Sequence, residues 1–210
     1  MLHAHGISTL VDIRAFPASR RLPHFNRESL EVELPKHGVA YIWMKELGGR
    51  RKKIRDDSPN TGLRSDSFRN YADYMLTEEF EEAIQRLLQI AEGTTGPSTP
   101  RPPHPAQQDR RDHAGAPLRM TTEADVPVTK EVMVARTAIM CAERLYFQCH
   151  RMLVSDYLTA HGHTVLHIED EKRSLRLHKL MPEAHLVKGR LVYNAQQLPF
   201  PPSKTASARE

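Results

Sequence analysis

The hydrophobic pattern of the chain opens with a short β-branched apolar run over residues 8–13, which is typical of a strand buried in a parallel sheet. Asn26 can cap a helix over residues 27–37, and another apolar run follows at 39–44. Pro35 is expected to shorten that helix, because proline lacks the N–H of a helical residue. A strand, a helix and a strand in this order predict a βαβ unit.

The alternation continues along the rest of the chain. Apolar spacing predicts a helix over 68–75 and another that is capped by Thr77 and ends at Gly93. A strand, a helix, a second strand and a final hairpin or strand are then expected over residues 132–140, 149–161, 163–168 and 186–193. This order predicts an α/β fold with a mostly parallel sheet covered by helices on both faces.

The composition changes between residues 94 and 128. Seven of the fifteen prolines fall in this stretch, which contains almost no large apolar residues. Such a segment buries too little surface to offset its ordering entropy, so a disordered insertion is predicted. Residues 1–93 and 129–195 are then expected to form one domain, followed by a disordered tail over 196–210.

Charge and apolar content narrow the range of partners. The chain has no apolar run of about 18 residues, so no membrane span is expected. Its first residues lack the layout of a signal peptide, which predicts a cytoplasmic protein whose two cysteines are free thiols. The net charge of +4 permits an anionic partner without requiring one.

Polar residues follow two of the predicted strands at the points where these strands end. Asp12 lies at the end of the strand predicted at 8–13, and Arg14 and Arg20 follow it. Cys141 and Glu143 follow the strand predicted at 132–140. Ligands of open parallel sheets bind at the carboxyl ends of the strands. These two groups of residues are therefore candidates for one site.

A helix is predicted to begin at Cys149-His150-Arg151. The free N–H groups of a helix N-terminus favour an anion or a thiolate, so this position would lower the pKa of Cys149. Arg151 could add a bidentate contact to an anion. The spacing differs from the C-x5-R loop of cysteine phosphatases, because Arg151 lies ten residues after Cys141 and two after Cys149.

The same residues suggest a metal site as an alternative. Cys141, Cys149 and His150 could bind zinc, with His167 or His178 as the fourth ligand. Their spacing is not a recognised zinc pattern, so neither a metal nor another cofactor is predicted.

A basic run occupies residues 50–55, where five of six residues are Lys or Arg. Most runs of this kind are solvated loops. Alternatively the run, including Arg50, contacts phosphates, which would make binding sensitive to salt. A nuclear targeting signal is a further alternative if the protein is eukaryotic.

Several short motifs follow one another in a recognisable order: Leu-Val-Asp12-Ile-Arg14, Pro17-x-Ser-Arg20, Leu47-Gly-Gly-Arg50, Cys141-Ala-Glu143 and Cys149-His-Arg151. Through them the sequence resembles the DUF488 family (domain of unknown function 488) over most of residues 5–193. The resemblance implies a Rossmann-like α/β fold, here without the family's first strand. It also implies a shared polar cluster, formed by Asp12, Arg14, Arg20, Cys141, Glu143, Cys149, His150, Arg151 and His178. It implies no activity.

The leading functional hypothesis is an enzyme that acts on an anionic substrate, a nucleotide or a nucleic acid. The anion would be held by Arg14, Arg20 and Arg151. Glu143 or His150 would transfer protons, and Cys149 or Cys141 would be the nucleophile. One alternative is a non-catalytic module that binds nucleic acid or a phosphorylated ligand. Another is structural, with Glu143 and Arg151 as a buried pair and the cysteines as packing residues.

Overall fold

A computed structural model describes residues 1–93, 136–169 and 175–194 of the chain. The predicted insertion at 94–128 and the predicted tail at 196–210 lie outside these residues, as do the first four residues of the strand predicted at 132–140.

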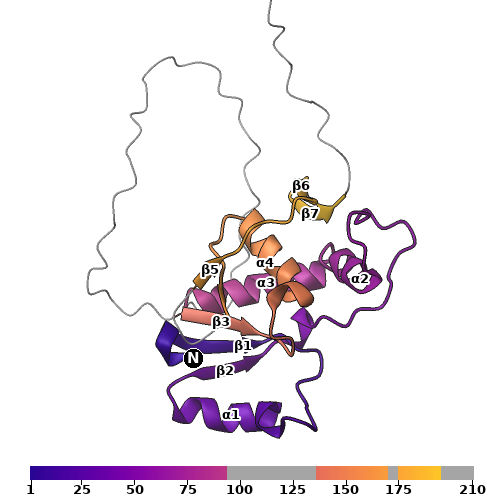
Figure 1. The fold of residues 1–210 in the computed structure, drawn as a ribbon. Coiled ribbons are helices and arrows are strands. Elements are labelled where there is room, and N and C mark those ends of the chain that lie inside the picture. Colours follow the sequence, from indigo (N-terminus) through magenta and orange to yellow (C-terminus); the bar gives the residue numbers. More distant parts are fainter. Residues whose placement is uncertain (94–135, 170–174, 195–210) are drawn as a thin grey trace, which may run out of the picture.

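The centre of the fold is a parallel sheet of three strands (Figure 1). The strands are β1 (Ile7–Asp12), β2 (Ala40–Trp43) and β3 (Arg136–Met140), in the order β2-β1-β3. Val11 of β1 lies opposite Ile42 on one side and Ile139 on the other. The prediction of an α/β fold with a parallel, Rossmann-like sheet is therefore confirmed.

Helices cover both faces of this sheet (Figure 1). The helix α1 (Arg27–Lys36) lies on one face, whereas α3 (Glu78–Ala91) and α4 (Arg151–Ala160) lie on the other. The shorter helix α2 (Asp66–Tyr74) precedes α3. The cap predicted at Thr77 is confirmed, because its hydroxyl oxygen accepts the N–H of Phe80.

Two helix boundaries differ from the prediction. Pro35 does not shorten α1, which continues to Lys36. The helix runs only one residue past the proline on an exposed face, so water can satisfy the carbonyl group that lacks its usual donor. The helix predicted from Cys149 begins at Arg151, because Cys149 has extended backbone angles.

Short 3-10 turns connect several of these elements. They are η1 (His3–His5), η2 (Pro23–Phe25), η3 (Lys45–Leu47) and η4 (Tyr146–Gln148). η3 follows β2 directly, and η4 lies between β3 and α4. Both therefore lie in connections that leave the carboxyl edge of the sheet.

The remaining strands form two antiparallel pairs outside the parallel sheet. β4 (Leu166–Ile168) pairs with β5 (Leu175–Leu177), and β6 (Ala184–Val187) pairs with β7 (Arg190–Tyr193). The expected hairpin around Gly189 is confirmed, and Lys188 and Gly189 in its turn both have positive φ. The strand predicted at 163–168 exists in shorter form, but it extends no parallel sheet.

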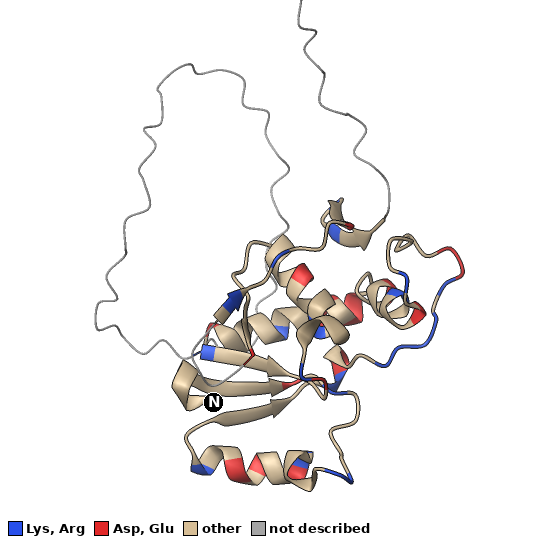
Figure 2. Ribbon diagram, viewed as in Figure 1, with Lys and Arg blue, Asp and Glu red and all other residues tan. Residues whose placement is uncertain are grey.

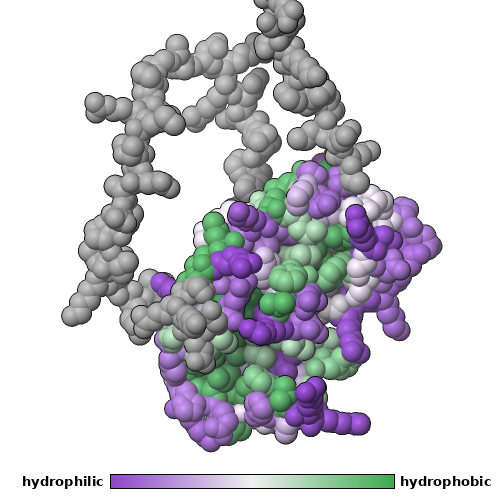
Figure 3. Space-filling view, in the orientation of Figure 1, coloured by the Kyte–Doolittle hydropathy of each residue, from purple (hydrophilic) through white to green (hydrophobic). Residues whose placement is uncertain are grey.

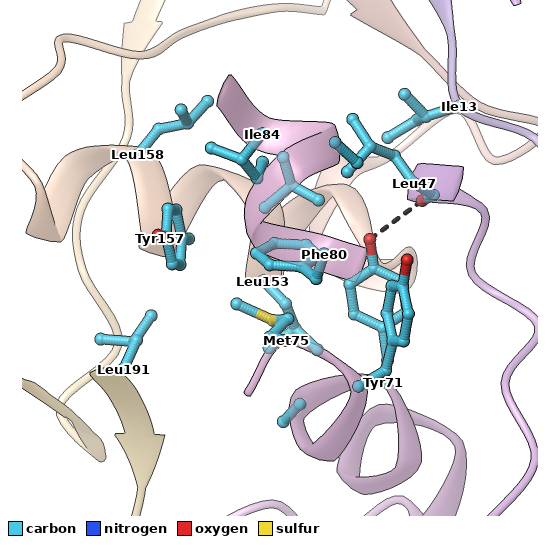
Figure 4. Packing of buried hydrophobic residues seen from close by; sticks show 14 of the residues in the cluster. Ile13, Leu47, Tyr71, Met75, Phe80, Ile84, Leu153, Tyr157, Leu158 and Leu191 are labelled. Carbon is cyan, nitrogen blue, oxygen red and sulfur yellow. Dashed lines mark hydrogen bonds between the residues drawn. The ribbon is translucent and has the colours of Figure 1, made fainter. Parts of the chain in front are cut away.

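The main core lies between the sheet, α2, α3 and α4. Phe80 is fully buried at its centre, with Tyr157 on one side and Tyr71 on the other in edge-to-face contacts (Figure 4). The hydroxyl of Tyr71 donates to the carbonyl of Leu47, 2.9 Å away. This core therefore anchors η3 and the loop after it, which leads to the candidate site.

The surface is less uniform than the core. In the view of Figure 3, apolar patches alternate with polar side chains. Leu166, Leu175 and Leu177, all on the β4–β5 pair, are among the exposed large apolar residues.

Candidate active site

A pocket of about 480 Å³ lies at the carboxyl end of the parallel sheet. Acidic and basic segments meet at this end of the strands (Figure 2). The loops after β1, β2 and β3 contribute to the pocket, together with the start of α2 and the residues that precede α4. The lining residues with polar, aromatic or sulfur-containing side chains are Arg14, Phe16, Arg50, Ser67, Phe68, Cys141, Glu143, Gln148, Cys149 and His150.

The centre of the site is the imidazole of His150. Its Nε2 lies 3.1 Å from the carbonyl oxygen of Ile13. Because a carbonyl can only accept a hydrogen bond, Nε2 carries a proton, and Nδ1 is the ring nitrogen that faces the thiols. Nδ1 lies 3.4 Å from Sγ of Cys149 and 3.8 Å from Sγ of Cys141. The ring is therefore oriented to accept a proton from either thiol.

The two thiols differ in acidity. The pKa of Cys149 is lowered to about 6, chiefly by a hydrogen bond from Cys141 and then by the backbone N–H and positive charge of Arg151, against the opposing effect of burial. The pKa of Cys141 is raised to about 12 by its hydrogen bond to Cys149 and by burial. At neutral pH Cys149 is thus a thiolate, and Cys141 is the thiol that donates to it.

Gly49 provides the space that His150 occupies. A Cβ atom on this glycine would overlap Nδ1 and Cγ of the imidazole. The ring of Tyr71 packs against the imidazole as well, with centroids 5.0 Å apart. The sequence indicated this glycine only as part of the Leu47-Gly-Gly-Arg50 motif. Its backbone φ is not positive, so close approach to the ring is the reason that glycine is needed.

Asp12 and Arg14 form a buried ion pair at the end of β1. Nε of Arg14 lies 2.9 Å from both carboxylate oxygens of Asp12, and the tyrosine hydroxyl of Tyr41 donates to the same carboxylate over 2.6 Å. Both residues were predicted to bind substrate. The structure places Arg14 on the pocket wall. Asp12 is fully buried, does not line the pocket, and orients the guanidinium of Arg14 through the ion pair.

The other predicted arginines lie in different surroundings. Arg50 is exposed on the pocket wall, with its guanidinium carbon 5.8 Å from the ring centroid of Phe16. Arg20 is exposed and is not among the residues that line the pocket. Arg51 was not singled out from the sequence. It donates to the carbonyls of Gly48 and Glu46 and thereby fixes the loop that carries Arg50.

Arg151 holds the loop between β3 and α4 in place. Its guanidinium donates to the carbonyl of Glu143 and, over 3.1 Å, to the carbonyl of Arg144. The alternative of a buried Glu143–Arg151 pair is wrong, because the side chain of Glu143 is exposed on the pocket wall and the arginine binds backbone oxygen. Arg151 therefore acts on Cys149 through its charge and its backbone N–H, which lies 3.5 Å from Sγ.

His178 was grouped with the predicted site, but the structure places it in a separate buried network. Its Nε2 lies 2.9 Å from the carboxylate of Asp156, and its Nδ1 lies 2.8 Å from Nε2 of His167. Tyr146 stacks on His167 with ring centroids 3.5 Å apart, and the hydroxyl of Tyr193 donates to Asp156. The network joins α4 to η4, β4, β7 and the residue that follows β5.

Three donor atoms of the site could hold a metal ion. The sulfurs of Cys141 and Cys149 and a ring nitrogen of His150 lie within 4.8 Å of one another, and these ligand types suit a thiophilic cation such as Zn²⁺. In the described part of the chain no fourth His, Cys, Asp or Glu joins the group. His167 and His178, considered as fourth ligands from the sequence, are bonded to each other instead.

The fold and the site together define an α/β domain with a thiolate and an imidazole at the carboxyl edge of its parallel sheet. Residues 1–96 match the family model described as "Domain of unknown function DUF488", so the resemblance to this family is confirmed for that stretch. The match includes Asp12, Arg14 and Gly49 but ends before Cys141 and Cys149. The placement of the cysteines in one site with the matched residues therefore rests on the structure.

The other comparisons add no relative. No curated protein matches the chain, and no solved structure matches it. Among the described residues, no helix has the length and apolar character needed to cross a membrane.

Proposed function

We propose that the protein is an enzyme in which the Cys149 thiolate attacks an electrophilic centre of an anionic substrate, either a nucleotide or a nucleic acid. The observation that carries the proposal is the contact between Sγ of Cys149 and Nδ1 of His150, whose ring is fixed through its other nitrogen by Ile13. A nucleophile, a base and a group that orients the base are the elements of thiol catalysis.

The pocket supplies the remaining groups. Arg50 presents a guanidinium at its exposed wall and would bind a phosphate or carboxylate of the substrate. The carboxyl group of Glu143 lines the same pocket and would transfer a proton to or from the substrate. Arg14 is paired with Asp12, which neutralises its charge. Its guanidinium would therefore contribute a hydrogen-bond donor that is fixed in position.

Alkylation of the full chain with iodoacetamide across pH 4–9 tests the nucleophile. The alkylation rate of Cys149 is expected to reach half its maximum near pH 6, the pKa of this thiol. A free cysteine has a pKa near 8.5, so at pH 6 its thiolate fraction is about 100-fold smaller. The pH midpoint is independent of how far burial slows entry of the reagent, which is why it is the quantity to measure.

Two variants control this experiment. In C149S the alkylation midpoint near pH 6 should disappear, and in C141A the midpoint should rise because the donor to the Cys149 thiolate is removed. A Cys149 midpoint above pH 8 in the wild-type protein would refute the activated thiol.

The anion site has its own test. A panel of nucleotides and short single-stranded oligonucleotides can be screened by thermal shift with the wild-type protein, R50A and R20A. R50A is expected to lose the shift given by an anionic ligand, whereas R20A, also an exposed arginine but outside the pocket wall, should keep it. Equal loss in both variants would indicate non-specific charge effects instead of the proposed pocket.

A non-catalytic nucleic-acid module is the second candidate, and it is favoured by the exposure of Lys52 and Arg55 beside Arg50. It predicts binding that weakens as salt rises and that survives C149S. Arg51 should be left intact in this test, because it holds the loop. A reducing compartment, such as the cytosol or nucleus, belongs to the enzyme proposal because it keeps both thiols free.

A further inference from the structure

Two sulfur atoms share one proton acceptor at the site. Sγ of Cys149 and Sγ of Cys141 both face Nδ1 of His150, at 3.4 and 3.8 Å, and the three atoms lie within 4.8 Å of one another. Nucleophilic attack by Cys149 on a substrate needs one thiol and one base. The second thiol, which is half-buried on the same pocket wall, donates a hydrogen bond to the thiolate but forms no covalent bond in that reaction.

We propose that Cys141 and Cys149 form a site of reversible oxidation by hydroperoxides, in which Cys149 is oxidised first and Cys141 resolves the product into a disulfide. The site would take a small hydroperoxide, which the pocket of about 480 Å³ can admit to the sulfur of Cys149. This inference rests on the proposed function only in using the same Cys149 thiolate.

The chemistry balances in two steps. The Cys149 thiolate attacks one oxygen of hydrogen peroxide and breaks the O–O bond, which gives a Cys149 sulfenic acid and hydroxide; the hydroxide takes up a proton. His150 Nδ1 then accepts the proton of the Cys141 thiol, and the Cys141 sulfur attacks the Cys149 sulfur. The S–O bond breaks, the disulfide forms, and the proton leaves with the hydroxyl as water. Two thiols are oxidised by two electrons in total, and one peroxide is reduced to two waters.

The environments of the two cysteines assign these roles. Cys149 has its sulfur 3.5 Å from the backbone N–H of Arg151 at the start of α4, a donor that stabilises a thiolate, so it is the sulfur that attacks peroxide. Cys141 follows β3 and lies 3.8 Å from Nδ1 of His150, so it is the thiol that gives up its proton once the sulfenic acid has formed. A low-pKa thiol beside a resolving cysteine is the usual arrangement of a redox-sensitive site.

The chain between the two cysteines permits bond formation. The sulfurs must approach to about 2.05 Å, which requires rotation of the side chains and a small shift of the loop. The side chains of Ala142, Glu143 and Arg144 are exposed, so little packing opposes this shift, and the hydrogen bonds from Arg151 to the carbonyls of Glu143 and Arg144 must move with the loop. The resulting disulfide would block the nucleophile and protect it from further oxidation, until a dithiol reductant restores both thiols.

Oxidation of the full chain with stoichiometric hydrogen peroxide tests the proposal. The wild-type protein should lose two hydrogens by intact mass and yield a linked Cys141–Cys149 peptide. It should become unreactive to iodoacetamide and recover fully with dithiothreitol. C149S should resist the same dose. C141S, which cannot form the disulfide, should stop at a sulfenic acid at that dose and should proceed to an irreversible sulfinic acid, with two added oxygens, when several equivalents of peroxide are supplied to it and to the wild-type protein in parallel. C141A offers a second variant if C141S does not fold, as judged by circular dichroism.

The outcomes separate this inference from the proposed function. If wild-type Cys149 reaches sulfinic acid as fast as it does in C141S, or if no linked peptide forms, the disulfide inference is wrong, even when the alkylation midpoint lies near pH 6. If the linked peptide forms but the midpoint lies above pH 8, the redox site stands and the activated nucleophile fails.

Discussion

The buried histidine His167 should make the protein sensitive to acid. Burial, followed by the nearby charges of His178, Arg151 and Arg176, lowers the pKa of His167 to about 4, and its side chain stays neutral in the folded protein. In the unfolded chain the pKa returns to about 6.5. Between these two values the unfolded state binds a proton that the folded state does not. The free energy of unfolding therefore falls as the pH drops from 6.5 to 4.

The size of this effect follows from the pKa difference. Each pKa unit corresponds to about 1.4 kcal/mol, so the shift from about 6.5 to about 4 removes about 3 kcal/mol of stability across this range. A loss of this size is a large part of the 5–15 kcal/mol that stabilises an ordinary domain. Above pH 7 His167 is neutral in both states and contributes no pH dependence.

A matched variant isolates this contribution. Nε2 of His178 donates to Asp156, and Nδ1 of His178 lies 2.8 Å from Nε2 of His167, a contact that an amide side chain can also make. H167Q keeps a donor near that position but cannot titrate. Urea unfolding at pH 7, 6, 5 and 4 should show the wild-type protein losing about 3 kcal/mol more than H167Q over this range. Parallel curves for the two proteins would show that His167 is not held neutral, and the reasoning from burial would fail.

Two further predictions follow from close packing. G49A places a methyl group where His150 lies, so the Cys149 alkylation rate should fall at least tenfold while far-ultraviolet circular dichroism keeps its helical signal; unchanged alkylation would show that the ring can move aside. L153A removes a fully buried side chain from the core and should lower the free energy of unfolding, measured by urea denaturation, by about 2–5 kcal/mol. A loss below about 1 kcal/mol would contradict this expectation.

The order of elements was predictable because local signals agreed with the tertiary structure. The strand that ends at Asp12 and the helix cap at Thr77 each depend on a few neighbouring residues, and the structure confirms both. The neighbourhood of Cys141 and Cys149 was predictable for a related reason. The carboxyl ends of adjacent parallel strands meet at one edge of the sheet.

The errors arose where partners lie far apart in the sequence. His178 was grouped with the cysteines, but antiparallel pairing of β4 and β5 directs it to His167 and Asp156. The bond from His150 to the carbonyl of Ile13 spans 137 residues and uses a backbone atom, so no side-chain pattern reveals it. The need for glycine at position 49 is equally invisible, because the ring that fills the space comes from a distant helix end.

The bond between His150 and Ile13 also bears on how the chain acquires reactivity. Ile13 follows β1, and His150 follows β3, more than a hundred residues later, so β1 is synthesised before β3. Until β3 has paired with β1, the imidazole has no fixed tautomer and the cysteines titrate as ordinary thiols. A growing chain on the ribosome would thus carry two cysteines with ordinary pKa values, and a lowered pKa of Cys149 would report that β3 has docked on β1.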